Sequence, residues 1–85
     1  MAASSIYTSL MERIATNPNP DDIVMSPDEA AAYTSLPKGQ LAQLRYAGQG
    51  PAFLKPAPKT VLYRKGDIDV WLSASVRHST AEVPA

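Results

Sequence analysis

The sequence contains no cysteine, which excludes disulfide bonds and thiolate metal sites and is typical of proteins in a reducing compartment. It also lacks any apolar run close to the roughly 20 residues that a membrane-crossing helix needs. The first residues, MAASSIYTSLMERIA, have neither the basic start nor the continuous apolar stretch of a signal peptide. A chain of 85 residues is enough for one small domain. We therefore expect a soluble, cytoplasmic protein.

Groups that carry catalysis are scarce as well. The single histidine, His78, falls in the expected C-terminal tail, and we expect no serine to have a histidine base beside it in the folded domain. The four glycines lack the strand-to-helix context of a phosphate-binding loop. Asp67 and Asp69 occupy alternate helix positions, which do not face each other and so do not suggest a metal site. We expect no enzymatic activity, no cofactor and no metal.

Net charge is zero, but the charges are unevenly placed. Residues 36–65 contain no Asp or Glu and hold most of the basic residues, namely Lys38, Arg45, Lys55, Lys59, Arg64 and Lys65. Such a cluster is the expected footprint of an anionic partner. A solvated basic face explains the composition equally well.

The N-terminal 22 residues are expected to form a helix followed by a linker. Residues 4–15 place Ile6, Tyr7, Leu10 and Ile14 on one stripe, with Ser4 or Ser5 as a cap. The segment NPNPDD (17–22) then contains two prolines and cannot continue a helix.

Two short helices are expected next. In SPDEAAAY, Ser26 is placed as an N-cap, Pro27 as the first helical residue and Glu29 at the capping-box position, which predicts a helix over residues 27–33. Met25 and Ala30 have the spacing of a hydrophobic staple around this box. After TSLP, a second helix is expected from Pro37 to Ala47, ended by GQGP. Leu41 and Leu44 would face inward, whereas the outward face would carry Gly39, Ala42, Gln43 and Tyr46.

The rest of the domain is expected to be a hairpin and a last helix. AFLK and TVLYR have the character of strands, and PAPK between them is expected to be an exposed loop. GDIDVWLSASV predicts a helix with Asp67 in its first turn. Lys65 and Asp69 are interpreted as solvated, and the residues from Val76 onward as a flexible tail. The expected core side chains of this half are Phe53, Val61, Tyr63, Ile68, Trp71 and Leu72.

The resulting order of helix, turn, helix, hairpin and helix is that of a winged helix-turn-helix, with an additional N-terminal helix. Residues 25–72 also resemble the small MerR-like winged-helix proteins of the excisionase and phage-regulator group. The resemblance is carried by SPDEAAAY, by Leu41, Leu44 and Arg45, by the GxGP at 48–51, by Phe53 and Lys55, and by LYRKGDIDVWL. We accordingly divide the chain into a helix and linker (1–22), a DNA-binding domain (23–75) and a tail (76–85).

The resemblance implies a role in DNA binding for residues of the second helix and the hairpin. On the recognition helix these are Lys38, Gly39, Gln40, Gln43, Arg45 and Tyr46, and on the wing they are Lys55, Lys59 and Arg64. Gln can pair with adenine in the major groove, although a plain solvated glutamine is the alternative. Arg45 is expected at a phosphate or in a surface ion pair, and Tyr46 either at a phosphate or against the hairpin.

The resemblance further implies an excisionase, or recombination directionality factor. Such a protein binds attachment-site DNA cooperatively, bends it, and promotes excision of a mobile element by an integrase, most simply of the tyrosine type. The expected partners are double-stranded DNA, the integrase and neighbouring copies of the protein on DNA, without a membrane. A transcriptional regulator of a phage or integrative element, with the same fold, is the alternative. The N-terminal helix would pad the core or contact a neighbouring copy.

Overall fold

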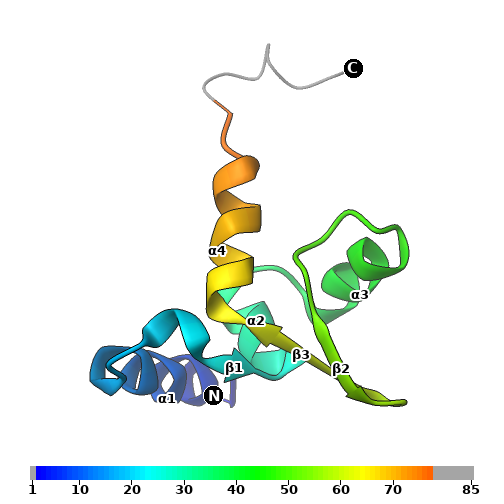
Figure 1. The fold of residues 1–85 in the computed structure, drawn as a ribbon. Helices are drawn as coiled ribbons and strands as arrows, with labels where there is room; N and C mark the ends of the chain where they lie inside the picture. The colour runs from blue at the N-terminus through cyan, green and yellow to red at the C-terminus, as the bar shows by residue number, and fades with distance from the viewer. Residues whose placement is uncertain (1, 78–85) are drawn as a thin grey trace.

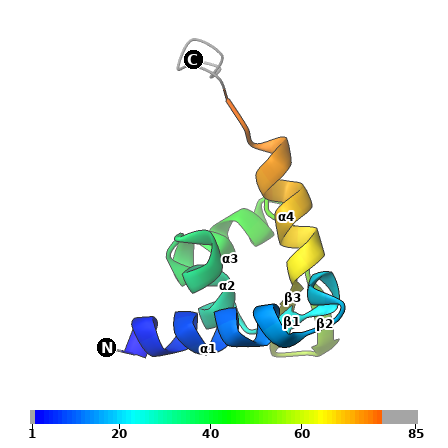
Figure 2. The same ribbon diagram turned by 90° about the vertical axis from the view of Figure 1, so that its left-hand side faces the viewer.

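The computed structural model describes residues 2–77, and in this range the chain is mainly helical with a small three-stranded antiparallel sheet (Figure 1). This confirms the predicted mainly helical content with a small sheet, although the sheet has one strand more than the predicted hairpin. The elements in chain order are α1 (Ala2–Thr16), the 3₁₀ turn η1 (Pro20–Asp22), β1 (Val24–Met25), α2 (Pro27–Thr34), α3 (Lys38–Tyr46), β2 (Leu54–Ala57), β3 (Thr60–Arg64) and α4 (Lys65–Ala74). Figure 2 shows α1 lying across the base of the molecule and α4 rising away from it.

Helix α1 packs against α2 through one stripe, as its pattern predicted. Leu10 is fully buried, and Ile14 is half-buried against the core. Tyr7 is 47% exposed, so it lies at the edge of the stripe. Ser4 and Ser5 lie inside α1 and not at its N-cap, so the predicted cap is wrong. Arg13 Nη2 lies 2.6 Å from Glu29 Oε2 and joins the end of α1 to the start of α2.

The predicted capping box at the start of α2 is present. The Ser26 hydroxyl accepts from the Glu29 backbone N–H at 3.1 Å, and Glu29 Oε1 accepts from the Ser26 N–H at 2.9 Å. Met25 and Ala30, on either side of the box, are both fully buried in the core. The helix ends at Ser35, which has a left-handed backbone (φ 64°). One side chain, Glu29, thus caps α2 and anchors α1.

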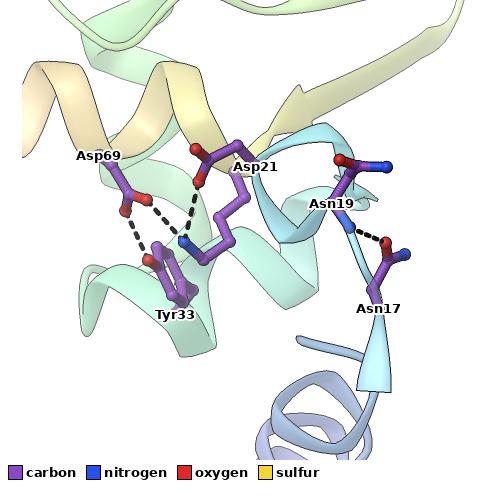
Figure 3. Close-up of polar contacts among 6 residues, drawn as sticks. Asn17, Asn19, Asp21, Tyr33 and Asp69 are labelled. Carbon is purple, nitrogen blue, oxygen red and sulfur yellow. Dashed lines mark hydrogen bonds and ion pairs between the residues drawn. The ribbon is translucent and has the colours of Figure 1, made fainter. Parts of the chain in front are cut away.

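The segment between α1 and α2 is more ordered than its composition suggested. Asn17 Oδ1 accepts from the Asn19 N–H at 2.8 Å, and the chain then forms η1 (Figure 3). This turn packs on the start of α4, where a Cβ at Gly66 would lie 3.2 Å from the Asp21 carbonyl oxygen. The following β1 pairs with β3 in the register Val24 with Arg64 and Met25 with Tyr63. The sequence did not predict this strand, because two residues are too few to show the alternation of apolar and polar side chains that marks a strand.

Helix α3 is one residue shorter at each end than predicted, with Pro37 at its N-cap. Leu41 is buried and Leu44 is half-buried, as their spacing predicted. Gly48 adopts φ 70°, and the Gln49 N–H donates to the Leu44 carbonyl while the Gly48 N–H donates to that of Arg45. These two bonds form a Schellman motif, which satisfies carbonyls that the end of the helix leaves open.

The hairpin extends further than predicted. Pro56 and Ala57 belong to β2, and the turn is reduced to Pro58 and Lys59, so half of PAPK is strand and not loop. This is possible because the strand order is β1-β3-β2, which puts β2 at an edge where the missing proline N–H is tolerated. The pairing is irregular between Leu54 and Ala57.

The hydrophobic core joins all the helices to the sheet. Its buried members are Leu10, Ile23, Met25, Ala30, Leu41, Tyr63 and Ile68. Of the predicted core residues, Tyr63 and Ile68 are confirmed, and Val61 packs partly buried against the cluster. Phe53 (41% exposed) and Leu72 (36% exposed) are not core residues, and Trp71 is only half-buried. The predicted burial of Trp71 and Leu72 was wrong because α4 projects beyond the body, which leaves little protein to cover its outer turns (Figure 1). Phe53 precedes β2 and lies beside the Arg45 guanidinium at the surface.

Val76 and Arg77 follow α4 as exposed residues, and the rest of the predicted tail, with His78, lies outside the described residues. Within residues 2–77, no helix is both long and apolar enough to cross a bilayer.

Candidate nucleic-acid interface

The outward face of α3 is polar, small and aromatic. Gly39, Gln40 and Gln43 are exposed, and a Cβ at Gly39 would meet nothing within 4 Å. Tyr46 is 85% exposed at the end of the same helix. Because Leu41 and Leu44 hold the opposite side of α3 against the body, this face remains accessible along the helix. Of the predicted recognition residues, Gly39, Gln40, Gln43 and Tyr46 are therefore exposed on α3.

A surface hollow lies between α3 and the hairpin. A larger part of about 540 Å³ is lined by Arg45, Tyr46, Phe53, Lys55, Pro58, Lys59 and Val61. An adjoining part of about 310 Å³ is lined by Pro27, Lys38, Gly39, Ala42, Arg45, Lys59 and Val61. The two parts share Arg45, Lys59 and Val61, and neither has an acidic residue in its lining. We call this surface the basic hollow.

The lysines of the basic hollow differ in their ion pairs. Lys38 Nζ lies 3.2 Å from Asp28 Oδ1, but both side chains are about 60% exposed, so the pair is weak and easily exchanged for another anion. Lys55 and Lys59 are exposed and pair with no carboxylate in the described part of the chain. These three lysines can bind an anion without first losing a strong internal contact.

Arg45 differs from the three lysines in being held by neutral partners. Its Nη1 donates to the Tyr63 hydroxyl at 2.9 Å. Its guanidinium lies 5.4 Å from the centre of the Tyr46 ring and 5.7 Å from that of Phe53. A surface ion pair, one of the two sequence-based alternatives for Arg45, is not formed with any carboxylate of the described residues, and the guanidinium contacts the Tyr63 hydroxyl instead.

Arg64 lies apart from the basic hollow. It is the last residue of β3 and pairs with Val24 of β1, whereas Lys59 lies in the turn at the opposite end of the hairpin. Its Nη1 is 3.7 Å from Asp67 Oδ2 in the first turn of α4. The structure therefore brings together Lys38, Gly39, Arg45, Tyr46, Lys55 and Lys59, and leaves Arg64 at a different place.

Lys65 was interpreted as a solvated residue, and this is wrong. Its side chain is only 15% exposed, and its Nζ lies 2.8 Å from Asp69 Oδ2 and 3.4 Å from Asp21 Oδ1. The Tyr33 hydroxyl donates to the other Asp69 oxygen, so Asp69 is not a solvated residue either (Figure 3). This network joins α2, η1 and α4.

The network shifts two pKa values. The hydrogen bond to Asp69 raises the pKa of Lys65 far above its usual range, against the opposing effect of burial. Burial and the hydrogen bond to Asp69 raise the pKa of Tyr33. Both groups therefore keep their protons at neutral pH. The i,i+4 spacing of Lys65 and Asp69 was visible in the sequence, but Tyr33 and Asp21 come from other elements.

Trp71 has a role that its sequence context did not indicate. Its Nε1 donates to the Gln49 carbonyl oxygen at 2.9 Å, which ties the loop after α3 to α4. In the same loop, a Cβ at Gly50 would lie 3.1 Å from the Leu44 Cβ, so the chain passes close to α3. These contacts fix the path from α3 to the hairpin.

Comparison with known proteins finds no matching family, no matching curated protein and no matching solved structure. The resemblance to the excisionase group thus stays a prediction from the motifs. Any assignment of function depends on the residues and geometry of this chain.

Proposed function

We propose that the chain is a winged helix-turn-helix protein that binds double-stranded DNA. In this proposal α3 is the recognition helix, the β2–β3 hairpin is the wing, and α2 supports α3 across the short turn at Ser35. The observation that supports it most strongly is the basic hollow, whose lining joins α3 to the hairpin and contains no acid among the described residues. An acid-free basic concavity beside an exposed helix suits a phosphate backbone flanking a groove.

The proposed contacts fall into two kinds. Gln40 and Gln43, on the exposed face of α3, are suited to base edges in the major groove, where Gln pairs with adenine. Lys38, Lys55 and Lys59 are suited to phosphates, which fix the position of the protein without carrying sequence information. Arg64 is excluded from the set because it pairs with Asp67 away from the hollow.

We further propose, from the sequence resemblance, that the protein is an excisionase of a mobile element and acts in the cytoplasm on nucleoid DNA. Bending a site by 40–90° costs about 1–6 kcal/mol, which several small proteins can offset together more easily than one. Cooperative binding of several copies beside an integrase follows from that cost. The bond-making and bond-breaking steps belong to the integrase in this scheme.

The test is a titration of the protein with labelled duplexes tiled across the DNA around its own gene, followed by fluorescence anisotropy at several salt concentrations. Three phosphate contacts predict that the logarithm of the association constant falls with the logarithm of salt with a slope of about −2.7. Replacing both hairpin lysines, Lys55→Gln with Lys59→Gln, should reduce the slope to about −0.9. Arg77→Gln, which removes one charge beyond the end of α4, is the matched control and should leave the slope unchanged.

Two outcomes would overturn the proposal at different levels. Absence of binding to every tile at low salt would rule out DNA as the partner. If the protein binds DNA but does not stimulate excision in a reconstituted integrase reaction, the excisionase role is ruled out. The alternative role, regulation of transcription, would then be the proposal that still stands.

A further inference from the structure

We infer that Arg45 is a positioning residue that fixes the wing relative to the recognition helix, and that it does not contact DNA. This inference depends on the proposed function for its consequence, but its structural part can be tested without DNA. It departs from the sequence-based expectation, which placed Arg45 at a phosphate.

The first observation is the bond between Arg45 and Tyr63. Arg45 lies in the last turn of α3, and Tyr63 lies on β3, the central strand of the sheet. Tyr63 is 1% exposed and is paired with Met25 of β1, so its hydroxyl is a fixed acceptor in the body of the protein. The 2.9 Å bond from Arg45 Nη1 therefore joins α3 directly to the strand that carries the wing.

The second observation is the aromatic environment of the guanidinium. The Phe53 ring, just before β2, and the Tyr46 ring, on α3, both lie within 6 Å of the guanidinium carbon. Such contacts between a cation and an aromatic ring are individually modest and are stronger where water is excluded. Together with Tyr63 they place one planar group between α3, the start of β2 and β3.

Charge supplies the third observation. Arg45 pairs with no carboxylate in the part of the chain that the structure describes. Lys55 and Lys59 reach solvent from the hairpin, whereas Arg45 is half-buried at the floor between the two elements. One N–H bond to Tyr63 and two aromatic rings beside the same group suit the planar guanidinium of arginine, which a compact lysine ammonium does not reproduce.

The consequence concerns DNA binding. A helix and a wing that contact one duplex must hold their phosphate-binding groups at a fixed spacing. If Arg45 sets that spacing, its loss lowers affinity without removing a phosphate contact. These two roles can be separated by the slope of the logarithm of the association constant against the logarithm of salt, because each lost phosphate contact reduces the size of this slope by about 0.9.

The DNA experiment compares Arg45→Gln, Arg45→Lys, Tyr63→Phe and the double variant Arg45→Gln/Tyr63→Phe. Each is measured for DNA affinity over a series of salt concentrations, at a temperature where circular dichroism shows that all are folded. We expect both Arg45 variants and Tyr63→Phe to weaken binding by about tenfold with the wild-type slope, corresponding to 1.4 kcal/mol. The double variant should bind no more weakly than Arg45→Gln, because both changes break the same link. A slope reduced by about 0.9 in Arg45→Gln and restored in Arg45→Lys would overturn the inference in favour of a phosphate contact.

The DNA-free experiment uses the absence of cysteine, which lets two spin labels be placed uniquely. Gln40→Cys on α3 and Thr60→Cys on the hairpin are both exposed sites, and pulsed electron resonance gives the distribution of distances between them. We expect this distribution to broaden when Arg45→Gln or Tyr63→Phe is added, and to stay narrow when Lys55→Gln is added as a control. An unchanged distribution in Arg45→Gln would overturn the inference, whatever the result with DNA. Failure of the wild-type protein to bind DNA would refute the proposed function but not the positioning role.

Discussion

Replacing Lys65 with methionine should destabilise the protein more than any other loss of a single positive charge in residues 36–65. Methionine keeps the length and most of the apolar stem of lysine but removes the ammonium group. In the structure this group bonds to Asp69 and Asp21 and lies 5.9 Å from the centre of the Tyr33 ring. The substitution thus removes the centre of the network that holds α2, η1 and α4 together.

The expected loss of stability follows from how far the Lys65 ammonium group and its carboxylate partners are shielded from water. A hydrogen bond to a charged group contributes about 1.5–3 kcal/mol where it is shielded from water, and the Lys65 side chain is only 15% exposed. The bond to Asp21 adds little, because the Asp21 side chain is 78% exposed. We therefore expect the free energy of unfolding to fall by about 2 kcal/mol, with a decrease in Tm of about 10 °C for a domain of this size.

The assay is urea denaturation at pH 7 followed by circular dichroism. Lys59→Met is the matched control, since it makes the same chemical change at an exposed site in the hairpin turn and should alter stability by less than about 0.5 kcal/mol. Asp69→Asn combined with Lys65→Met should be less destabilising than the sum of the two single changes. If Lys65→Met and Lys59→Met have the same stability, the network does not stabilise the fold and the reasoning is wrong.

Three further predictions concern stability. The pKa values of Lys65 and Tyr33 are both raised by folding, so the stability that these two groups contribute should be fully present and constant below about pH 10 and should be lost as pH rises above it. In urea denaturation, the free energy of unfolding of Tyr33→Phe should therefore fall less between pH 9 and 11 than that of the wild type. Ser26→Ala removes the cap acceptor of α2 and should cost about 1 kcal/mol by the same method, whereas Ser73→Ala on the exposed side of α4 should not. Gly48→Ala puts a Cβ into the left-handed region at φ 70° and should cost about 1 kcal/mol in thermal denaturation, with no cost for Gly39→Ala, which has open space around it.

The elements that sequence predicted well are those fixed by local chemistry. The box at Ser26 and Glu29 and the stop at Gly48 need only neighbouring residues, so their geometry follows from spacing. The inward face of α3 was predicted for the same reason, because Leu41 and Leu44 share one side of any helix. The same periodicity predicted Gly39, Gln43 and Tyr46 on the outward face, and all three are exposed.

The elements that sequence predicted poorly depend on contacts between distant segments. Phe53 has the composition of a core residue, but the chain places it beside Arg45 at the surface. Lys65 and Asp69 were treated as solvated because Tyr33, far from them in sequence, supplies the third member of their network. The strand β1 has two residues and forms only because β3 offers an open edge.

The basic stretch of residues 36–65 divides into two groups, and this division changes the expected strength of its electrostatics. Arg45, Arg64 and Lys65 contact Tyr63, Asp67 and Asp69 of the protein itself. Lys38, Lys55 and Lys59 reach solvent around the basic hollow. Six phosphate contacts would give a salt slope of about −5.4, whereas the three lysines give about −2.7. A measured slope near about −5.4 would mean that DNA draws Arg45, Arg64 and Lys65 out of their internal contacts, and that the fold rearranges on binding.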